Sequence, residues 1–161
     1  MEEMIAEIKQ KQAEIKRLQK ELQDKSSEIF LSSFKNLFEE TPKLKSFAWS
    51  QYTPYFNDGE TCTFSANVDY IYINGICVDD SDWISEKTIT NYGTWNRETK
   101  KFEGRTEVSN LNYDSELVKA NDEIREFLYN FDEDFFMAQF GDHAKVTVTE
   151  EGVSVDEYEH D

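Results

Sequence analysis

The chain has 161 residues, enough for one domain with its own hydrophobic core, and 14% of them are aromatic, which argues against disorder. Its 34 Asp and Glu outnumber its 17 Lys and Arg, giving a net charge of −17. A surface this anionic repels nucleic-acid phosphates and anionic lipids, so direct binding to nucleic acid or membranes is disfavoured. A basic protein surface is the expected partner.

The opening residues and the cysteines predict a cytoplasmic protein. The chain starts Met1-Glu2-Glu3 and contains no uninterrupted apolar run of the roughly 18 residues that span a bilayer. Its two cysteines, Cys62 and Cys77, match neither a C-x-x-C nor a zinc spacing. We expect two reduced, half-buried thiols, with a disulfide as the less favoured alternative.

The first 25 residues predict a long amphipathic helix, from about residue 2 to 25. They hold six acids and six bases, whereas residues 26–161 hold 28 acids and 11 bases, so the negative charge lies in the rest of the chain. Apolar residues recur every seven positions in this segment, as in a coiled coil. Lys11 and Lys25 weaken this seam, whose oligomerisation contacts would be Ile8, Ile15, Leu18 and Leu22. The helix either pairs with a second copy, as a homodimer, or folds back on its own domain.

A wider aromatic stripe, Ile29 to Phe38, continues the helical spacing until Thr41-Pro42. Ser26-Ser27 either interrupts the helix or lies on its polar face. We therefore divide the chain into a helical N-terminal segment, 1–42, which can serve as a dimerisation coiled coil, and an acidic α+β domain, 43–161.

Strand signals follow from Phe47. Alternating residues at 47–56, 61–73 and 76–78 are separated by Asn57-Asp58-Gly59 and Asn74-Gly75, both suited to tight turns, and predict a three-stranded antiparallel meander. Weaker patterns predict short strands at 84–90 and 101–108.

One long amphipathic helix is predicted at 115–139, capped by Asp114 or Ser115, ended by Gly141 and packed on the sheet. A hairpin with its turn at Glu150-Glu151-Gly152 follows, and the residues after 155 are expected to fray. The fold class is therefore α+β.

Residues 114–161 contain 15 acids and three bases and are the candidate partner-binding surface. Carboxylates gathered on one face would attract a basic groove, including one that normally holds nucleic acid. The ten residues assigned to this face are Asp114, Glu116, Asp122, Glu123, Glu126, Asp132, Glu133, Asp134, Glu150 and Glu151.

Asp79, Asp80 and Asp82 are weak candidates for a metal site, because hard cations require several converging carboxylate oxygens. A calcium-binding loop starting at Asp80 would need Gly and Glu where the chain has Ser85 and Asn91. A solvated acidic turn is the better interpretation, and no metal or other cofactor is expected.

The catalytic signals are equally weak. His143 and His160 are the only histidines, and the motifs of nucleotide-binding loops, serine hydrolases and zinc proteases are missing from the sequence. We assign no catalytic residue and expect a protein that is not an enzyme, although a carboxylate pair acting as acid and base leaves no sequence trace.

An aromatic run at residues 49–56 surrounds Pro54, which is suited to an edge strand. Trp49, Tyr52 and Tyr55 would then form an exposed aromatic edge, or else fill a core short of Leu and Val. The sequence W-x-Q-Y-T-P-Y-F-N-D-G resembles a motif of small uncharacterised bacterial and phage proteins, to which no activity is attached. The resemblance implies a chain that is phage-borne or from a mobile element, and a phage-encoded chain would act in the host cytoplasm.

Three functions follow as hypotheses. The first is a non-enzymatic acidic module that binds a protein, including a phage inhibitor that mimics DNA charge against a host nucleic-acid-binding or defence protein. The second is a small metal-dependent enzyme using Asp79, Asp80 and Asp82. The third is a structural oligomerisation module joined through the N-terminal helix.

Overall fold

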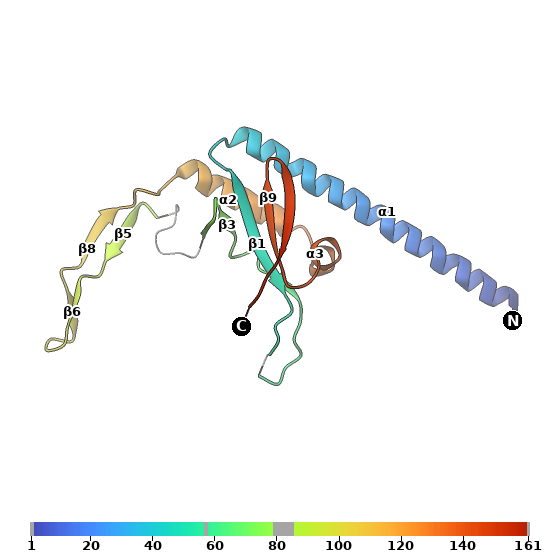
Figure 1. Ribbon diagram of the computed structural model, residues 1–161, viewed down its shortest axis with the longest axis horizontal. Helices are drawn as coiled ribbons and strands as arrows, with labels where there is room; N and C mark the ends of the chain where they lie inside the picture. The colour runs from blue at the N-terminus through green and yellow to red at the C-terminus, as the bar shows by residue number, and fades with distance from the viewer. Residues whose placement is uncertain (1, 57, 79–85, 161) are drawn as a thin grey trace.

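The computed structural model describes residues 2–56, 58–78 and 86–160, and it confirms the α+β class (Figure 1). A long N-terminal helix leads into an antiparallel sheet, two shorter helices and a projecting two-stranded arm.

Helix α1 spans Glu2–Glu40 without a break. The hydroxyl of Ser27 donates to the carbonyl of Gln23 at 2.8 Å, so this serine is satisfied within the helix and does not interrupt it. The helix ends just before Thr41-Pro42, as the proline predicted.

The main sheet is built around β1, Ser46–Tyr52, which lies in its interior. The strand order is β10-β9-β1-β3-β4, with β2 also paired to β1, and all pairs are antiparallel. The other strands are β2 (Ser65–Ala66), β3 (Tyr72–Ile73), β4 (Ile76–Cys77), β9 (Ala144–Thr149) and β10 (Gly152–Glu157).

The meander is present, with strands much shorter than predicted. Asn74 and Gly75 have φ of 51° and 86° between β3 and β4, which confirms the tight turn. Asn57 lies outside the described residues, while Asp58 and Gly59 both have positive φ, as expected for a turn. Pro54 was expected to mark an edge strand. It lies beyond the end of β1, so it removes no hydrogen bond from that strand, and β1 is an interior strand.

The single helix predicted at 115–139 is wrong. The chain forms α2, Ser115–Leu128, and α3, Glu133–Phe140, because Asp132 accepts a hydrogen bond from the Phe135 amide at 2.8 Å and starts a new helix. Gly141, with φ of 83°, ends α3 as expected.

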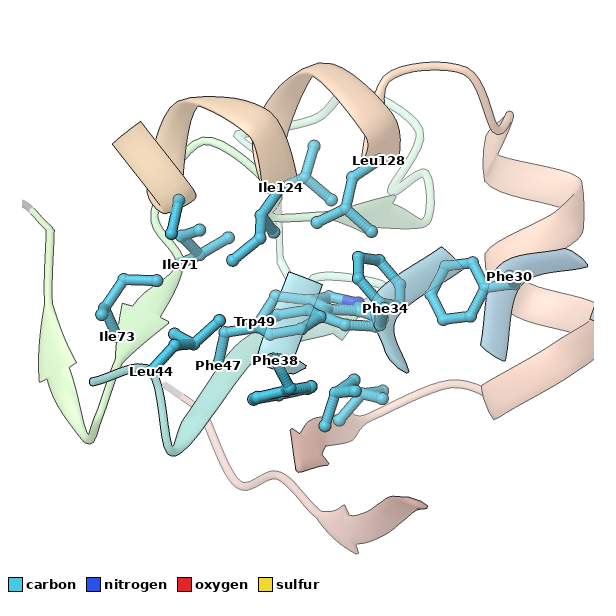
Figure 2. Close-up of a cluster of buried hydrophobic side chains, with 14 of the residues drawn as sticks. Phe30, Phe34, Phe38, Leu44, Phe47, Trp49, Ile71, Ile73, Ile124 and Leu128 are labelled. Carbon is cyan, nitrogen blue, oxygen red and sulfur yellow. The ribbon is translucent and has the colours of Figure 1, made fainter. Parts of the chain in front are cut away.

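The core is an aromatic cluster between α1, β1 and α2. Figure 2 shows Phe30, Phe34 and Phe38 of α1 beside Phe47 and Trp49 of β1, with Ile124 and Leu128 of α2 above them. Neighbouring rings are 4.7 Å apart for Phe34 and Phe47, and 4.9 Å for Phe30 and Phe34. The C-terminal part of α1 therefore shares its core with the sheet.

The arm is a long hairpin in two sections that extends away from the sheet (Figure 1). Strand β5 (Thr88–Asn91) pairs with β8 (Thr106–Ser109), and further out β6 (Thr94–Asn96) pairs with β7 (Lys101–Glu103). The predicted strand 101–108 is thus two strands divided at Gly104, β6 was not predicted, and residues 84–85 of the other predicted strand lie outside the described ones.

The predicted hairpin at the C-terminus is confirmed as β9 and β10. Fraying after residue 155 is wrong, because β10 continues to Glu157 and the Tyr158 amide donates to the His143 carbonyl at 2.7 Å.

Candidate functional site

The N-terminal part of α1, residues 4–25 and called the free part below, carries an exposed apolar surface. Residues 4–25 are all exposed, and Figure 1 shows this end of the helix extending away from the sheet. Ile8, Ile15, Leu18 and Leu22 are 52%, 55%, 50% and 68% exposed. The alternative in which this helix folds back on its own domain is therefore wrong.

The free part ends where α1 meets α3. Gln23 donates to the Ala138 carbonyl at 3.3 Å, and the Ser27 hydroxyl donates to the Gln139 side chain. An open cavity of about 320 Å³ lies beside these contacts, between Leu22 and Phe135. The free part of α1, residues 4–25, is therefore about three heptads long, and its last residues lie beside the contact with α3.

Three of the ten assigned acids are paired with lysines at the start and middle of α2. Asp114 caps α2 by accepting from the amides of Glu116 and Leu117, and Lys43 donates to it at 2.9 Å. Lys43 also lies 3.4 Å from Glu116, and Lys119 lies 3.3 Å from Glu123. The hydrogen bond from Lys43 is the main reason that the pKa of Asp114 is lowered.

Two more assigned acids hold the start of α3. Asp132 is its N-cap, and Glu133 accepts hydrogen bonds from the Ser65 hydroxyl at 3.2 Å and the Ala66 amide at 2.8 Å. In the single helix predicted at 115–139, Asp132, Glu133 and Asp134 would lie mid-helix, but they form the cap and first turn of a separate one. Glu133 therefore joins α3 to β2.

The remaining five assigned acids form no ion pair with another described residue. These are Asp122, Glu126, Asp134, Glu150 and Glu151. Together the ten acids occupy three parts of the fold: α2 with its cap, the first turn of α3, and the turn between β9 and β10. Five of the ten therefore form caps, hydrogen bonds or ion pairs within the fold.

The proposed aromatic edge is divided between core and surface. Trp49 is fully buried, Tyr52 is half-buried and Tyr55 is 67% exposed. The assignment of Trp49 to an exposed edge is wrong, because β1 lies inside the sheet and places this side chain in the core.

The structure brings together two histidines that no sequence pattern connects. Nδ1 of His143 and Nε2 of His160 lie 3.0 Å apart, and the two rings are nearly coplanar. Tyr55 stacks on both imidazoles, and Tyr52 stacks on His160 with ring centroids 3.8 Å apart.

Asp142 completes this cluster. It accepts from the amide and the hydroxyl of Thr53, each at 2.7 Å, and from the His143 amide at 2.8 Å, and its carboxylate lies 3.7 Å from His143 Nε2. Burial favours its neutral form, but the hydrogen bonds from Thr53 and the His143 amide, together with the nearby His143 ring, outweigh burial, so the pKa of Asp142 is lowered. An open cavity of about 850 Å³ adjoins the cluster, with Glu157 and Glu159 also on its wall.

This geometry is that of a hydrogen-bonded imidazole pair. One imidazole donates and the other accepts, in an order set by the tautomers, and the 3.0 Å separation is that of an ordinary N–H···N hydrogen bond. Among the described residues no group of three or more His, Cys, Asp or Glu is arranged to hold a metal ion. Asp79, Asp80 and Asp82, the weak metal candidates, lie outside the described residues.

The arm carries an aromatic strip. Trp95 and Phe102 are cross-strand partners with ring centroids 4.9 Å apart, and Tyr92 lies 5.9 Å from Phe102. These rings are about half exposed, and the Arg105 guanidinium lies over Tyr92. They stabilise a ribbon that has no other core.

Cys62 and Cys77 are free and half-buried, as predicted. Among the described residues no helix is long and apolar enough to span a membrane. No protein-family model, curated protein or solved structure matches the chain.

Proposed function

We propose that this protein is a non-enzymatic protein-binding module that holds a partner helix through the free part of α1. The observation that carries the proposal is the apolar column of Ile8, Ile15 and Leu22, each more than half exposed. Most of the stability of a helix in water comes from packing of its apolar face, and a helix with such a column is stabilised when a second helix covers it. Nothing else among the described residues covers this column.

The acidic domain contributes charge to this function. Five assigned acids form no ion pair among the described residues, but they lie on three elements, which supports long-range attraction of a basic partner more than docking on one patch. Inhibition of a host nucleic-acid-binding or defence protein is one form that such binding can take. The free thiols of Cys62 and Cys77 support a reducing compartment such as the cytoplasm.

The test is affinity capture from the native host with the full chain at low and high salt. We expect Ile8→Ser/Ile15→Ser to lose the captured protein and Gln10→Ser/Lys16→Ser, placed off the apolar column, to retain it. All four positions are exposed, so both variants should melt like the parent. Capture that survives Ile8→Ser/Ile15→Ser but disappears at high salt would assign binding to the acidic domain instead.

A further inference from the structure

The charges beside the apolar column of α1 are one-sided. With Ile8, Ile15 and Leu22 at position a of the heptad, position g is glutamate in every repeat: Glu7, Glu14, Glu21 and Glu28. Position e is uncharged in every repeat: Ile5, Gln12, Gln19 and Ser26. Positions e and g flank the seam and decide which helix is accepted as partner.

A second copy of the chain satisfies these charges in neither orientation. In a parallel pair each g glutamate faces an uncharged e′ residue, and Lys11 faces Lys11 in the seam. In an antiparallel pair the glutamates of the two g columns face each other. Like charges placed opposite one another at a helix interface select against that pairing.

The glutamates remain available to a partner. Glu14 and Glu21 have ion pairs only within α1, with Lys11 at 3.9 Å and Arg17 at 3.7 Å. Their side chains are 51% and 56% exposed, and pairs of this kind contribute little to stability. A cation on a partner helix can therefore replace or share these contacts.

We propose that α1 binds a helix of a different protein, one with Lys or Arg along the column facing Glu7, Glu14 and Glu21 and an acidic residue facing Lys11. This inference rests on the proposed function and names the chemistry of its partner. Apolar residues opposite Ile8, Ile15 and Leu22 supply the affinity, and the charges supply the choice of partner.

The test uses two synthetic helices of three heptads added to the full chain. Both have Ile at a and Leu at d, except for one Glu at the d position facing Lys11. One has Lys at every e and g position, and the other has Glu there. Three interhelical ion pairs of ordinary surface strength give about tenfold tighter binding of the lysine peptide by titration calorimetry. Raising the salt concentration should shrink this preference.

The matched variants change net charge equally. Glu7→Gln/Glu14→Gln/Glu21→Gln should reduce the preference to less than about threefold, because the three pairs are lost. Asp24→Asn/Glu150→Gln/Glu151→Gln, which alters three acids off the seam, should keep it. Because all these positions are exposed, the variants should fold.

Each other result has a distinct meaning. Equal binding of both peptides, or a tight homodimer of the full chain in sedimentation that excludes the lysine peptide, overturns the partner chemistry and leaves α1 as the binding helix. A monomer that binds neither peptide overturns both this inference and the proposed function of α1.

Discussion

Trp49 and Gln51 share a hydrogen bond in the core: the indole Nε1 donates to Gln51 Oε1 at 3.0 Å, and both side chains are fully buried. The Gln51 amide nitrogen in turn donates to the carbonyls of Phe136, at 3.1 Å, and Gly141. One glutamine thus joins the central strand to the end of α3.

Replacing Gln51 should be strongly destabilising. Gln51→Leu has similar volume but leaves the buried indole N–H without its acceptor and removes the hydrogen bonds to the Phe136 and Gly141 carbonyls, so we expect a loss of about 2–4 kcal/mol in the free energy of unfolding. Urea unfolding measures it, with Gln10→Leu on the exposed face of α1 as a control that should change stability by about 0.5 kcal/mol or less. A loss below about 1 kcal/mol would mean that water replaces the missing partners.

The same contacts give most residues of the W-x-Q-Y-T-P-Y run a role in packing or hydrogen bonding. Trp49 and Gln51 form the buried network, Thr53 binds Asp142, and Tyr52 and Tyr55 stack on His160. All of these partners lie in or next to the last 26 residues of the chain. The run therefore has a structural role in joining β1 to the C-terminal segment.

Local signals predicted the local features well. The helical periodicity of α1, the Asn74-Gly75 turn and the alternation of β9 and β10 are each encoded by neighbouring residues, and all are present. The break at Asp132 was missed because Phe131 and Phe135 keep a helical spacing across it. The available signal was Asp132 followed by two acids, which is typical of a helix start.

The His143–His160 contact could not be predicted, because it depends on how three distant segments pack. His160 reaches its place only because β10 continues to Glu157 and Tyr52 and Tyr55 lie next to the end of β1. Likewise, no sequence pattern reports that Lys43 neutralises Asp114 across 71 positions. Composition predicted an acidic protein, but only the fold shows which acids are paired.

The Lys43–Asp114 pair makes stability depend on pH at both ends of the range. The pKa of Asp114 is lowered, so its contribution is present above the unfolded-state pKa and is lost as pH falls through the folded-state value. The pKa of Lys43 is raised, chiefly by its hydrogen bond to Asp114, so its contribution is present below the unfolded-state pKa and is lost as pH rises through the folded-state value.

Asp114→Asn removes the negative charge but keeps the helix cap, because asparagine is also a good N-cap residue. We expect a lower urea midpoint than the parent at pH 7, and a difference that shrinks as the pH falls and the parent aspartate takes up a proton. Asp122→Asn, which removes an acid without an ion pair among the described residues, is the control. A midpoint difference that persists unchanged at pH 2 would point to a weaker cap instead.

Gly93 fixes the junction between the two sections of the arm. A Cβ at this position would lie 2.0 Å from the Glu103 carbonyl oxygen, and φ is +69°. Gly104 also has positive φ, +78°, but its Cβ would meet open space. We therefore expect Gly93→Ala to unpair β6 and β7, whereas Gly104→Ala costs only the backbone strain of about 1–2 kcal/mol.

Hydrogen exchange of the amides at 94–103 measures this pairing. Neither variant should change the melting temperature of the core, because no residue of the arm belongs to the described core cluster. If Gly93→Ala lowers that melting temperature as well, the arm and the sheet unfold as one unit.

The imidazole pair should contribute to the docking of the C-terminal segment. In a double-mutant cycle of His143→Ala and His160→Ala, removal of either ring breaks the 3.0 Å contact, so the two losses should not add. We expect a coupling energy of about 0.5–1.5 kcal/mol in urea unfolding, the ordinary strength of one hydrogen bond. His143→Ala combined with Lys119→Ala, on the distant α2 helix, should show no coupling beyond about 0.3 kcal/mol. Additive losses in the first cycle would mean that the nitrogen contact contributes nothing and that His160 is held by other contacts, which include stacking on Tyr52 and Tyr55.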